Sequence, residues 1–145
     1  MTLPPGQPLS MDATLDDMAE SFDLLGEWEE RYRHVIDMGR ALEPLSDHER
    51  NADTRVSGCA SQVWLVSARE GDVLHFRGDS DAHIVRGLIA VLLTLYSGRT
   101  AREILDFDAG AAVARLGLGS ALSSQRANGL AAMIARIRED AARAT

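Results

Sequence analysis

The chain has 145 residues, 46% of them hydrophobic and 26% charged, a composition typical of one globular domain with a single core. All 15 basic residues are arginines, and the absence of lysine excludes a Schiff base to pyridoxal phosphate, a phosphate-loop lysine and a serine–lysine dyad on this chain. The net charge is −7, and residues 1–55 carry 13 acidic against 5 basic side chains, which argues against a nucleic-acid partner.

The N-terminal stretch has no features of a targeting or membrane segment. Residues 1–13 lack a basic region and an apolar run and contain prolines, so we expect a flexible arm ahead of one domain spanning residues 14–145. The longest apolar stretch, 84–96, contains an arginine and is shorter than the roughly 20 residues that span a bilayer. Because a single cysteine cannot form an intramolecular disulfide, we expect a cytoplasmic protein.

Two helices are predicted at the start of the domain. Apolar residues recur at helical spacing after Thr14, the expected N-cap, until Gly26 interrupts the pattern. A second helix is expected over residues 27–42, with apolar and charged residues on opposite sides. Trp28 and Tyr32 lie one turn apart on this helix, and we interpret them as core packing rather than as a stack for a ligand.

A small antiparallel sheet is predicted next. Residues 62–67 and 73–77 are rich in residues that favour strands, and the turn-forming residues 69–72 between them indicate a hairpin. A short additional strand is expected near residues 54–57. His75 should lie on the solvent side of the second hairpin strand, because it has no companions that would make it a metal ligand.

The most buried element is expected to be a helix over residues 83–96, because apolar residues cover nearly its whole circumference. Residues 78–81 are predicted to form the turn that precedes it. Two carboxylates in this turn, Asp79 and Asp81, are interpreted as helix caps rather than as an acid/base or metal-binding pair.

The C-terminal third is predicted to be helical. Short helical segments are expected at 101–105 and 106–114, followed by a longer amphipathic helix that begins after Ser123. The first turn of this last helix contains Arg126 and Gly129. Both fit a helix start poorly, since an arginine opposes the helix dipole there and glycine is a weak helix former. A packing or functional reason for these residues is therefore indicated.

Cys59 is the only cysteine, and it lies in the loop before the first hairpin strand with Gly58 beside it. Glycine accepts positive φ, so the backbone can turn sharply or flex at this point. A lone cysteine is equally compatible with a buried apolar filler and with a reactive thiol. Arg55 is the nearby cation, and the sequence shows no other device for lowering the thiol pKa from its reference of about 8.5.

The chain resembles the SufE family, the sulfur-acceptor partners of cysteine desulfurases in iron–sulfur cluster assembly. Four segments in order carry the resemblance: residues 28–32 (WEERY), 56–64 (VSGCASQVW), 78–90 (GDSDAHIVRGLIA) and 124–133 (SQRANGLAAM). The resemblance implies an α+β fold similar to that of iron–sulfur scaffold proteins. In such a fold, N-terminal and C-terminal helices pack a small antiparallel sheet of about three strands.

The same resemblance implies that Cys59 is the sulfur-accepting residue. The partner desulfurase would supply a persulfide, Cys59 would take its outer sulfur by transpersulfuration, and an iron–sulfur assembly scaffold would receive it. Pyridoxal phosphate would belong to the desulfurase, so neither a cofactor nor a metal is expected on this chain. Gly58 is expected to permit the loop geometry, Asp81 to cap a helix near the loop, and Arg126 to place a cation close to the thiol.

Other interpretations stay open at the level of the sequence. An adaptor would activate the desulfurase by docking without carrying sulfur, whereas a thiol redox sensor is disfavoured because no resolving cysteine exists. A sulfur carrier of this kind is a partner of an enzyme rather than a stand-alone enzyme. The sequence does not determine the particular desulfurase, the final sulfur recipient, the choice between monomer and homodimer, or the role of His34.

Overall fold

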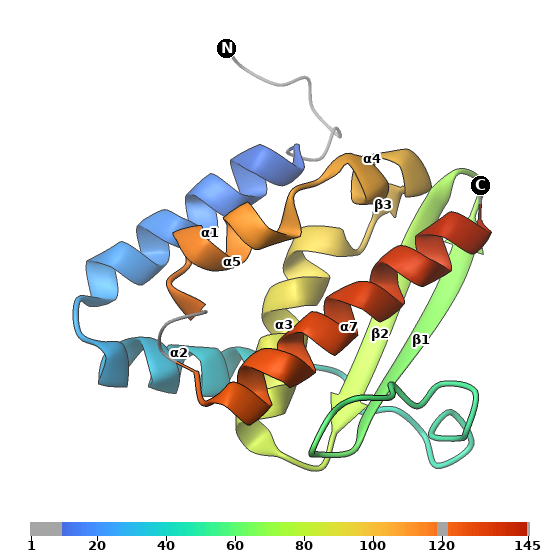
Figure 1. Ribbon diagram of the computed structural model, residues 1–145, viewed down its shortest axis with the longest axis horizontal. Helices are drawn as coiled ribbons and strands as arrows, with labels where there is room; N and C mark the ends of the chain where they lie inside the picture. Colours follow the sequence, from blue (N-terminus) through green and yellow to red (C-terminus); the bar gives the residue numbers. More distant parts are fainter. Residues whose placement is uncertain (1–9, 119–121, 145) are drawn as a thin grey trace.

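The computed structural model describes residues 10–118 and 122–144, in which helices pack a three-stranded antiparallel sheet (Figure 1). The predicted α+β class is therefore confirmed. The elements are α1 (Met11–Leu25), α2 (Trp28–Arg40), β1 (Val63–Glu70), β2 (Val73–Ser80), α3 (His83–Tyr96), β3 (Arg99–Thr100), α4 (Ala101–Asp106), α5 (Ala109–Arg115) and α7 (Ser124–Arg143).

The sheet has the strand order β1-β2-β3. The β1–β2 hairpin turns tightly, with Glu70 opposite Val73 and Gly71 supplying the positive φ of 61°. The third strand is β3, which pairs with the start of β2. The expected strand near residues 54–57 instead forms an isolated bridge, between Arg55 and Trp64, at the other edge of the sheet.

The turn predicted at residues 78–81 is wrong for its first three residues, which continue β2 and pair with β1. Gly78 is buried there, and a Cβ on it would approach a methyl group of Ile89 to 2.7 Å and one of Leu65 to 2.9 Å. Glycine at this position therefore lets α3 lie close against the sheet. His75 is exposed on β2, as predicted.

Helix α3 forms the centre of the core, and its expected burial is confirmed: nine of its 14 residues are buried. It lies against β2, while α2 packs against it on another side and α7 crosses it obliquely (Figure 1). The α2–α3 crossing is close because of two glycines. A Cβ on Gly87 would collide with the backbone of Val35, and one on Gly39 would collide with the backbone of Gly87.

The first helix begins earlier than predicted. Ser10, not Thr14, is its N-cap, because the Ser10 hydroxyl accepts a hydrogen bond from the amide of Ala13 at 3.1 Å. The expected arm over residues 1–13 is thus wrong for 11–13, which are helical, and residues 1–9 lie outside the described part of the chain.

His34 packs α2 against α1, with its ring edge-to-face on Phe22 at a centroid distance of 5.8 Å. Trp28 and Tyr32 are half-buried against the core, as the packing interpretation predicts. Within the described ranges, no helix is long and apolar enough to cross a membrane.

Candidate functional site around Cys59

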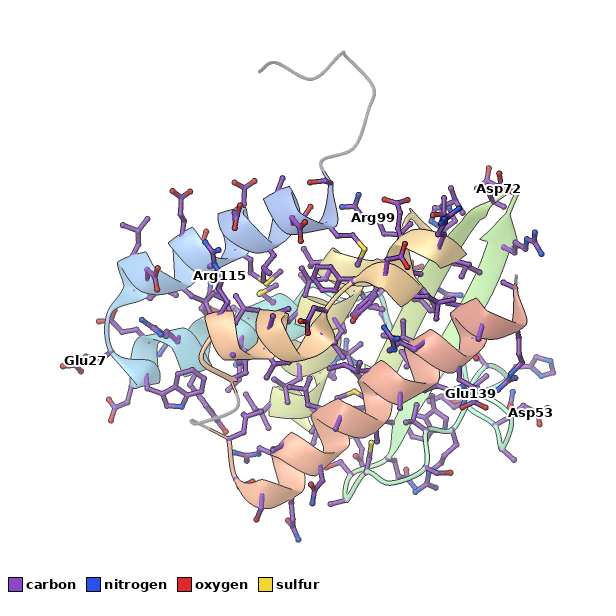
Figure 2. The ribbon with its side chains drawn as sticks, turned by 45° about the horizontal axis from the view of Figure 1, so that its top comes forward. Glu27, Asp53, Asp72, Arg99, Arg115 and Glu139 are labelled. Atoms are coloured by element: carbon purple, nitrogen blue, oxygen red, sulfur yellow. The ribbon has the colours of Figure 1, made fainter. Side chains whose placement is uncertain are left out.

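The loop that carries Cys59 is held firmly on its N-terminal side. The backbone amide of Val56 donates to the carbonyl of Val63 at 2.9 Å, joining the loop to β1. The same N-terminal part of the loop is also tied to α7, because Arg136 of that helix donates to the carbonyl oxygens of Asp53 at 2.6 Å and Arg55 at 3.1 Å. In Figure 2 the loop at Asp53 lies beside α7 near Glu139, in agreement with these contacts. The loop therefore enters the site from a fixed position.

Gly58 gives the loop its turn immediately before the cysteine. Its φ is +91°, a conformation that L-residues with side chains rarely adopt. A Cβ at this position would also lie 3.3 Å from the Cβ of Ala132 on α7. Both the backbone conformation and the close approach to α7 thus favour glycine, and together they direct the next residue toward the helix.

The thiol of Cys59 is half-buried against α7. Its Sγ lies 3.7 Å from the carbonyl oxygen of Gly129, to which it donates a hydrogen bond. A Cβ on Gly129 would lie 3.8 Å from Sγ, an ordinary van der Waals distance, so the thiol packs directly on this turn of the helix. Burial raises the pKa of the Cys59 thiol, and the positive charge of Arg55 opposes part of the rise. In the resting structure the thiol is therefore held as the neutral, weakly nucleophilic form at pH 7.

A cavity of about 310 Å³ opens beside the thiol, between the loop, α3 and α7. Its walls combine apolar side chains with polar groups, which come from Ser61 on the loop and from the start of α7. The lining residues are Cys59, Ala60, Ser61, Ala82, Ile84, Val85, Leu88, Ser123, Gln125, Arg126, Gly129 and Met133. A group bound to Cys59 in this cavity would be surrounded by side chains rather than by bulk water.

Arg126 and Cys59 line the same cavity, although they are 67 positions apart in the sequence. The guanidinium carbon of Arg126 lies 5.7 Å from the ring centroid of Tyr32, a cation–π contact that joins α7 to α2 at the cavity. Arginine in the first turn of α7 is thus accounted for by a tertiary contact. Gly129, three residues further along α7, lies against the thiol through its carbonyl oxygen.

Asp81 supports the loop in a way that the sequence did not predict. The expectation that it caps α3 is wrong: the N-cap residue is Ala82, and the helix start has no side-chain cap. Asp81 instead accepts a hydrogen bond from the amide of Gln62 at 3.1 Å and donates its own amide to the Gln62 carbonyl at 3.4 Å. Because β2 continues to Ser80, Asp81 lies at the strand end, where it fixes the C-terminal side of the Cys59 loop.

Asp79 is neither a helix cap nor part of an acid/base pair. Its side chain is buried, forms an ion pair with Arg86 of α3, and accepts hydrogen bonds from the amides of Leu45 at 3.0 Å and Ser80 at 2.8 Å. Arg86 also donates to the carbonyl oxygens of Gly39, in the last turn of α2, and of Leu42, just beyond it. This network joins α2, β2 and α3 beneath the site.

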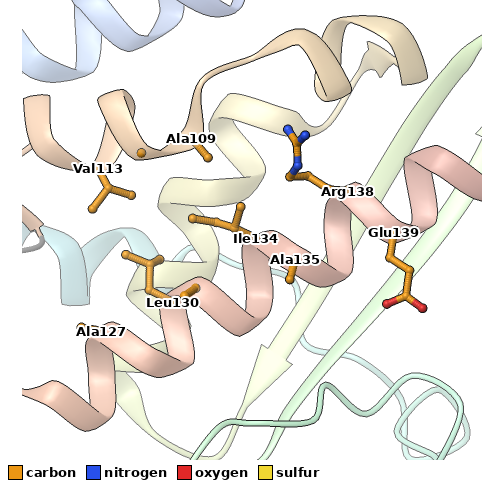
Figure 3. Close-up of a pocket in the computed structure, with 10 residues that line it drawn as sticks. Ala109, Val113, Ala127, Leu130, Ile134, Ala135, Arg138 and Glu139 are labelled. Carbon is orange, nitrogen blue, oxygen red and sulfur yellow. The ribbon is translucent and has the colours of Figure 1, made fainter.

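A larger groove, of about 690 Å³, lies between α5 and α7 (Figure 3). It is lined mostly by apolar side chains such as Val113, Leu130 and Ile134. Its two charged residues are already engaged, because Arg138 donates to carbonyls at the end of α4 and Glu139 forms an ion pair with Arg143. The groove therefore lacks the nucleophile and free polar groups that the Cys59 cavity has.

Across residues 10–118 and 122–144, no three histidine, cysteine, aspartate or glutamate side chains gather as metal ligands would.

The contacts that sequence reasoning missed are those of Arg136, Gly129 and Arg86. Apart from the ion pairs of Arg86 with Asp79 and of Arg136 with Asp140, their partners lie 44 to 83 positions away, so no local pattern identifies them.

The fold and the site define a small α+β protein with one thiol held in a loop over a helix. The chain belongs to the SufE family, described as an Fe–S metabolism associated domain, whose model matches residues 16–141. Family membership associates the protein with iron–sulfur metabolism.

Individual proteins agree with the family assignment. The chain is 50% identical over 143 residues to an uncharacterized SufE-like protein of Rhizobium etli, covering 96% of both chains. It is 48% identical over 132 residues to an uncharacterized SufE-like protein of Rhizobium meliloti, covering 88% of this chain and 94% of the other. The solution structure of a hypothetical protein from Thermus thermophilus is similar with a TM-score of 0.74 at 19% identity, covering 90% of this chain and 95% of that one. At that identity, the structural likeness concerns the fold.

Proposed function

We propose that the protein accepts persulfide sulfur from a cysteine desulfurase on Cys59, stimulates the desulfurase by relieving it of sulfur, and delivers the sulfur to an iron–sulfur assembly scaffold. The observation that supports this function most directly is the placement of the lone thiol, half-buried, at the wall of a cavity between the loop, α3 and α7, in a chain of the SufE family. The protein would act in the cytoplasm, where thiols stay reduced.

The transfer is a thiol exchange on sulfur. The Cys59 thiolate attacks the outer sulfur of the donor persulfide, a new S–S bond forms on Cys59, and the donor cysteine leaves as a thiolate. One S–S bond forms while another breaks, so no oxidant or reductant is consumed. The exchange is therefore close to thermoneutral, and the direction follows from partner binding and from consumption of the sulfur.

The resting position of the thiol suppresses unwanted reactions. Burial keeps the thiol neutral, and the hydrogen bond to the Gly129 carbonyl holds it toward α7. Docking of the donor would draw Cys59 out of this position, with Gly58 as the pivot, and would lower the pKa by relieving burial. The product persulfide would then return to the cavity, protected from other thiols.

The supporting residues act on the loop and the cavity. Asp81 holds the loop through the amide of Gln62, and Arg126 supplies a cation at the cavity wall. Pyridoxal phosphate chemistry stays with the desulfurase, since this chain has no lysine to hold that cofactor as a Schiff base.

The test is intact mass spectrometry of the protein after incubation with its cognate desulfurase and cysteine, without reductant. The native protein should gain one or more sulfur atoms, while a Cys59→Ser variant gains none. Stimulated desulfurase turnover without any sulfur on the native protein would refute the acceptor function in favour of a docking adaptor.

A further inference from the structure

Three arginines differ from the others in this acidic chain. All 15 lie within the described residues, and the guanidinium groups of 12 of them form a hydrogen bond or an ion pair with a carboxylate, a carbonyl or a hydroxyl. For Arg33, Arg55 and Arg126, the residues 10–118 and 122–144 provide neither a hydrogen bond nor an ion pair to the guanidinium. This occurs although carboxylates outnumber arginines by 22 to 15.

Two of these arginines lie beside the thiol, and the third lies on the neighbouring helix α2. Arg126 lines the Cys59 cavity and lies over the ring of Tyr32 on α2. Arg55 acts electrostatically on the Cys59 thiol and lines a further hollow of about 480 Å³ that includes Ser57. Arg33 follows Tyr32 and lines a groove of about 640 Å³ along α2, which it shares with Glu29, Asp37 and Arg40. The three guanidinium groups therefore lie on the Cys59 loop, on the cavity wall and on the helix that Arg126 contacts.

An unpaired guanidinium is a ready site for a carboxylate, because its planar donors match the two oxygens. Elsewhere on this surface the arginines have internal partners, so an external anion would have to compete with them. At Arg33, Arg55 and Arg126 an external anion would not have to compete with an internal partner.

We propose that Arg33, Arg55 and Arg126 form a carboxylate-binding rim that receives an acidic segment of the sulfur-donating protein. The inference rests on the proposed function of Cys59 as a sulfur acceptor. A polypeptide fits the observations better than one small anion, because the arginines border separate hollows. The groove on α2 also presents Trp28 and Tyr32, residue types that often anchor protein interfaces.

The first experiment measures the association rate of the protein with its cognate desulfurase at low and high salt. Arg33→Gln, Arg55→Gln and Arg126→Gln should each lower the rate about three-fold at low salt, and the triple variant about ten-fold or more, because charges of this kind steer encounter. The differences should vanish near 1 M salt, where the screening length is about 3 Å. Arg102→Gln is the matched control, since the Arg102 side chain is 92% exposed on α4 and its ion pair with Asp106 spans 3.9 Å. A triple variant that associates like the native protein overturns the proposal.

A second experiment needs no partner and probes the rim at the thiol. Cys59 is alkylated with anionic iodoacetate and with neutral iodoacetamide, and the ratio of the two rates is compared among variants. Arg55→Gln and Arg126→Gln should each lower the iodoacetate/iodoacetamide ratio about two-fold at low salt, while Arg102→Gln leaves it unchanged. An unchanged ratio in both rim variants would contradict an anion-attracting rim. A lower ratio together with native association rates would assign the rim to a small anion and refute the docking surface.

The outcomes for the rim and for sulfur transfer are separable. A native protein that gains no sulfur from the desulfurase refutes the acceptor function. The rim is judged on association rates and alkylation ratios, which need no sulfur transfer.

Discussion

The buried ion pair beneath the site offers the sharpest test of what holds the fold together. In Asp79→Asn, the Arg86 guanidinium keeps its carbonyl partners at Gly39 and Leu42 but loses its counter-charge. Removal of one member of a buried pair costs about 3–5 kcal/mol, because the remaining charge is uncompensated. The Arg86 side chain is 20% exposed and still hydrogen-bonded, so the lower end, about 3 kcal/mol, is expected.

Urea unfolding followed by circular dichroism measures this loss. With a slope of about 2 kcal/mol per molar urea, the midpoint of Asp79→Asn should fall by about 1.5 M. The double variant Asp79→Asn/Arg86→Met removes the orphaned charge as well, so it should be more stable than Asp79→Asn. Asp106→Asn is the control, because its ion pair with Arg102 is exposed and should contribute less than about 0.5 kcal/mol. A loss below about 1 kcal/mol in Asp79→Asn, or a double variant less stable than the single one, would refute the reasoning.

Three further predictions concern the loop and its surroundings. Gly58→Ala should lower unfolding stability by about 1–3 kcal/mol through its positive φ and the contact with Ala132, and unaltered stability in urea would contradict the strained loop. Because burial raises the pKa of Cys59, the alkylation rate of the native protein should still climb above about pH 8.5. The stability of the native protein relative to Cys59→Ser should be constant at lower pH and decline as pH rises through the native pKa. An alkylation profile equal to that of the urea-unfolded chain would disprove the raised pKa. Hydrogen bonds from Arg77, with a smaller contribution from Ser46, hold the pKa of Glu49 at about 2. The stabilising effect of the ionised Glu49 carboxylate should therefore be present above pH 4.5 and disappear toward pH 2. A Glu49 carboxyl NMR shift that titrates near 4.5 would exclude this effect.

Local sequence patterns predicted the elements that bury one continuous apolar surface. Helix α3 and the β1–β2 hairpin are of this kind, since periodicity and turn residues act over a few positions. The end of β2 was mistaken for a turn because Gly78, Asp79 and Ser80 are turn-forming residues. They lie in a strand because α3 packs against Gly78 and Arg86 compensates the buried Asp79, and both causes are tertiary.

The candidate site follows the same division. Cys59 and Gly58 could be selected from the sequence, because the chain has one cysteine and a glycine beside it in a loop. The side chain that fixes the loop, Arg136, could not, because it reaches backbone carbonyls more than 80 positions away. Arg126 was selected as an exception to helix-dipole preference, and its contact with Tyr32 gives the physical cause.

The attachments of the Cys59 loop set a limit on how far the sulfur atom can travel. Val56 is tied to β1 and Gln62 to the end of β2, so Cys59 is three residues from each tether. Even fully extended, three residues span only about 10 Å. Under the proposed function, a donor would therefore have to bring its own sulfur to within that radius, for example on a mobile cysteine segment. The choice of partners would then depend on the length of the partner's segment as much as on surface complementarity.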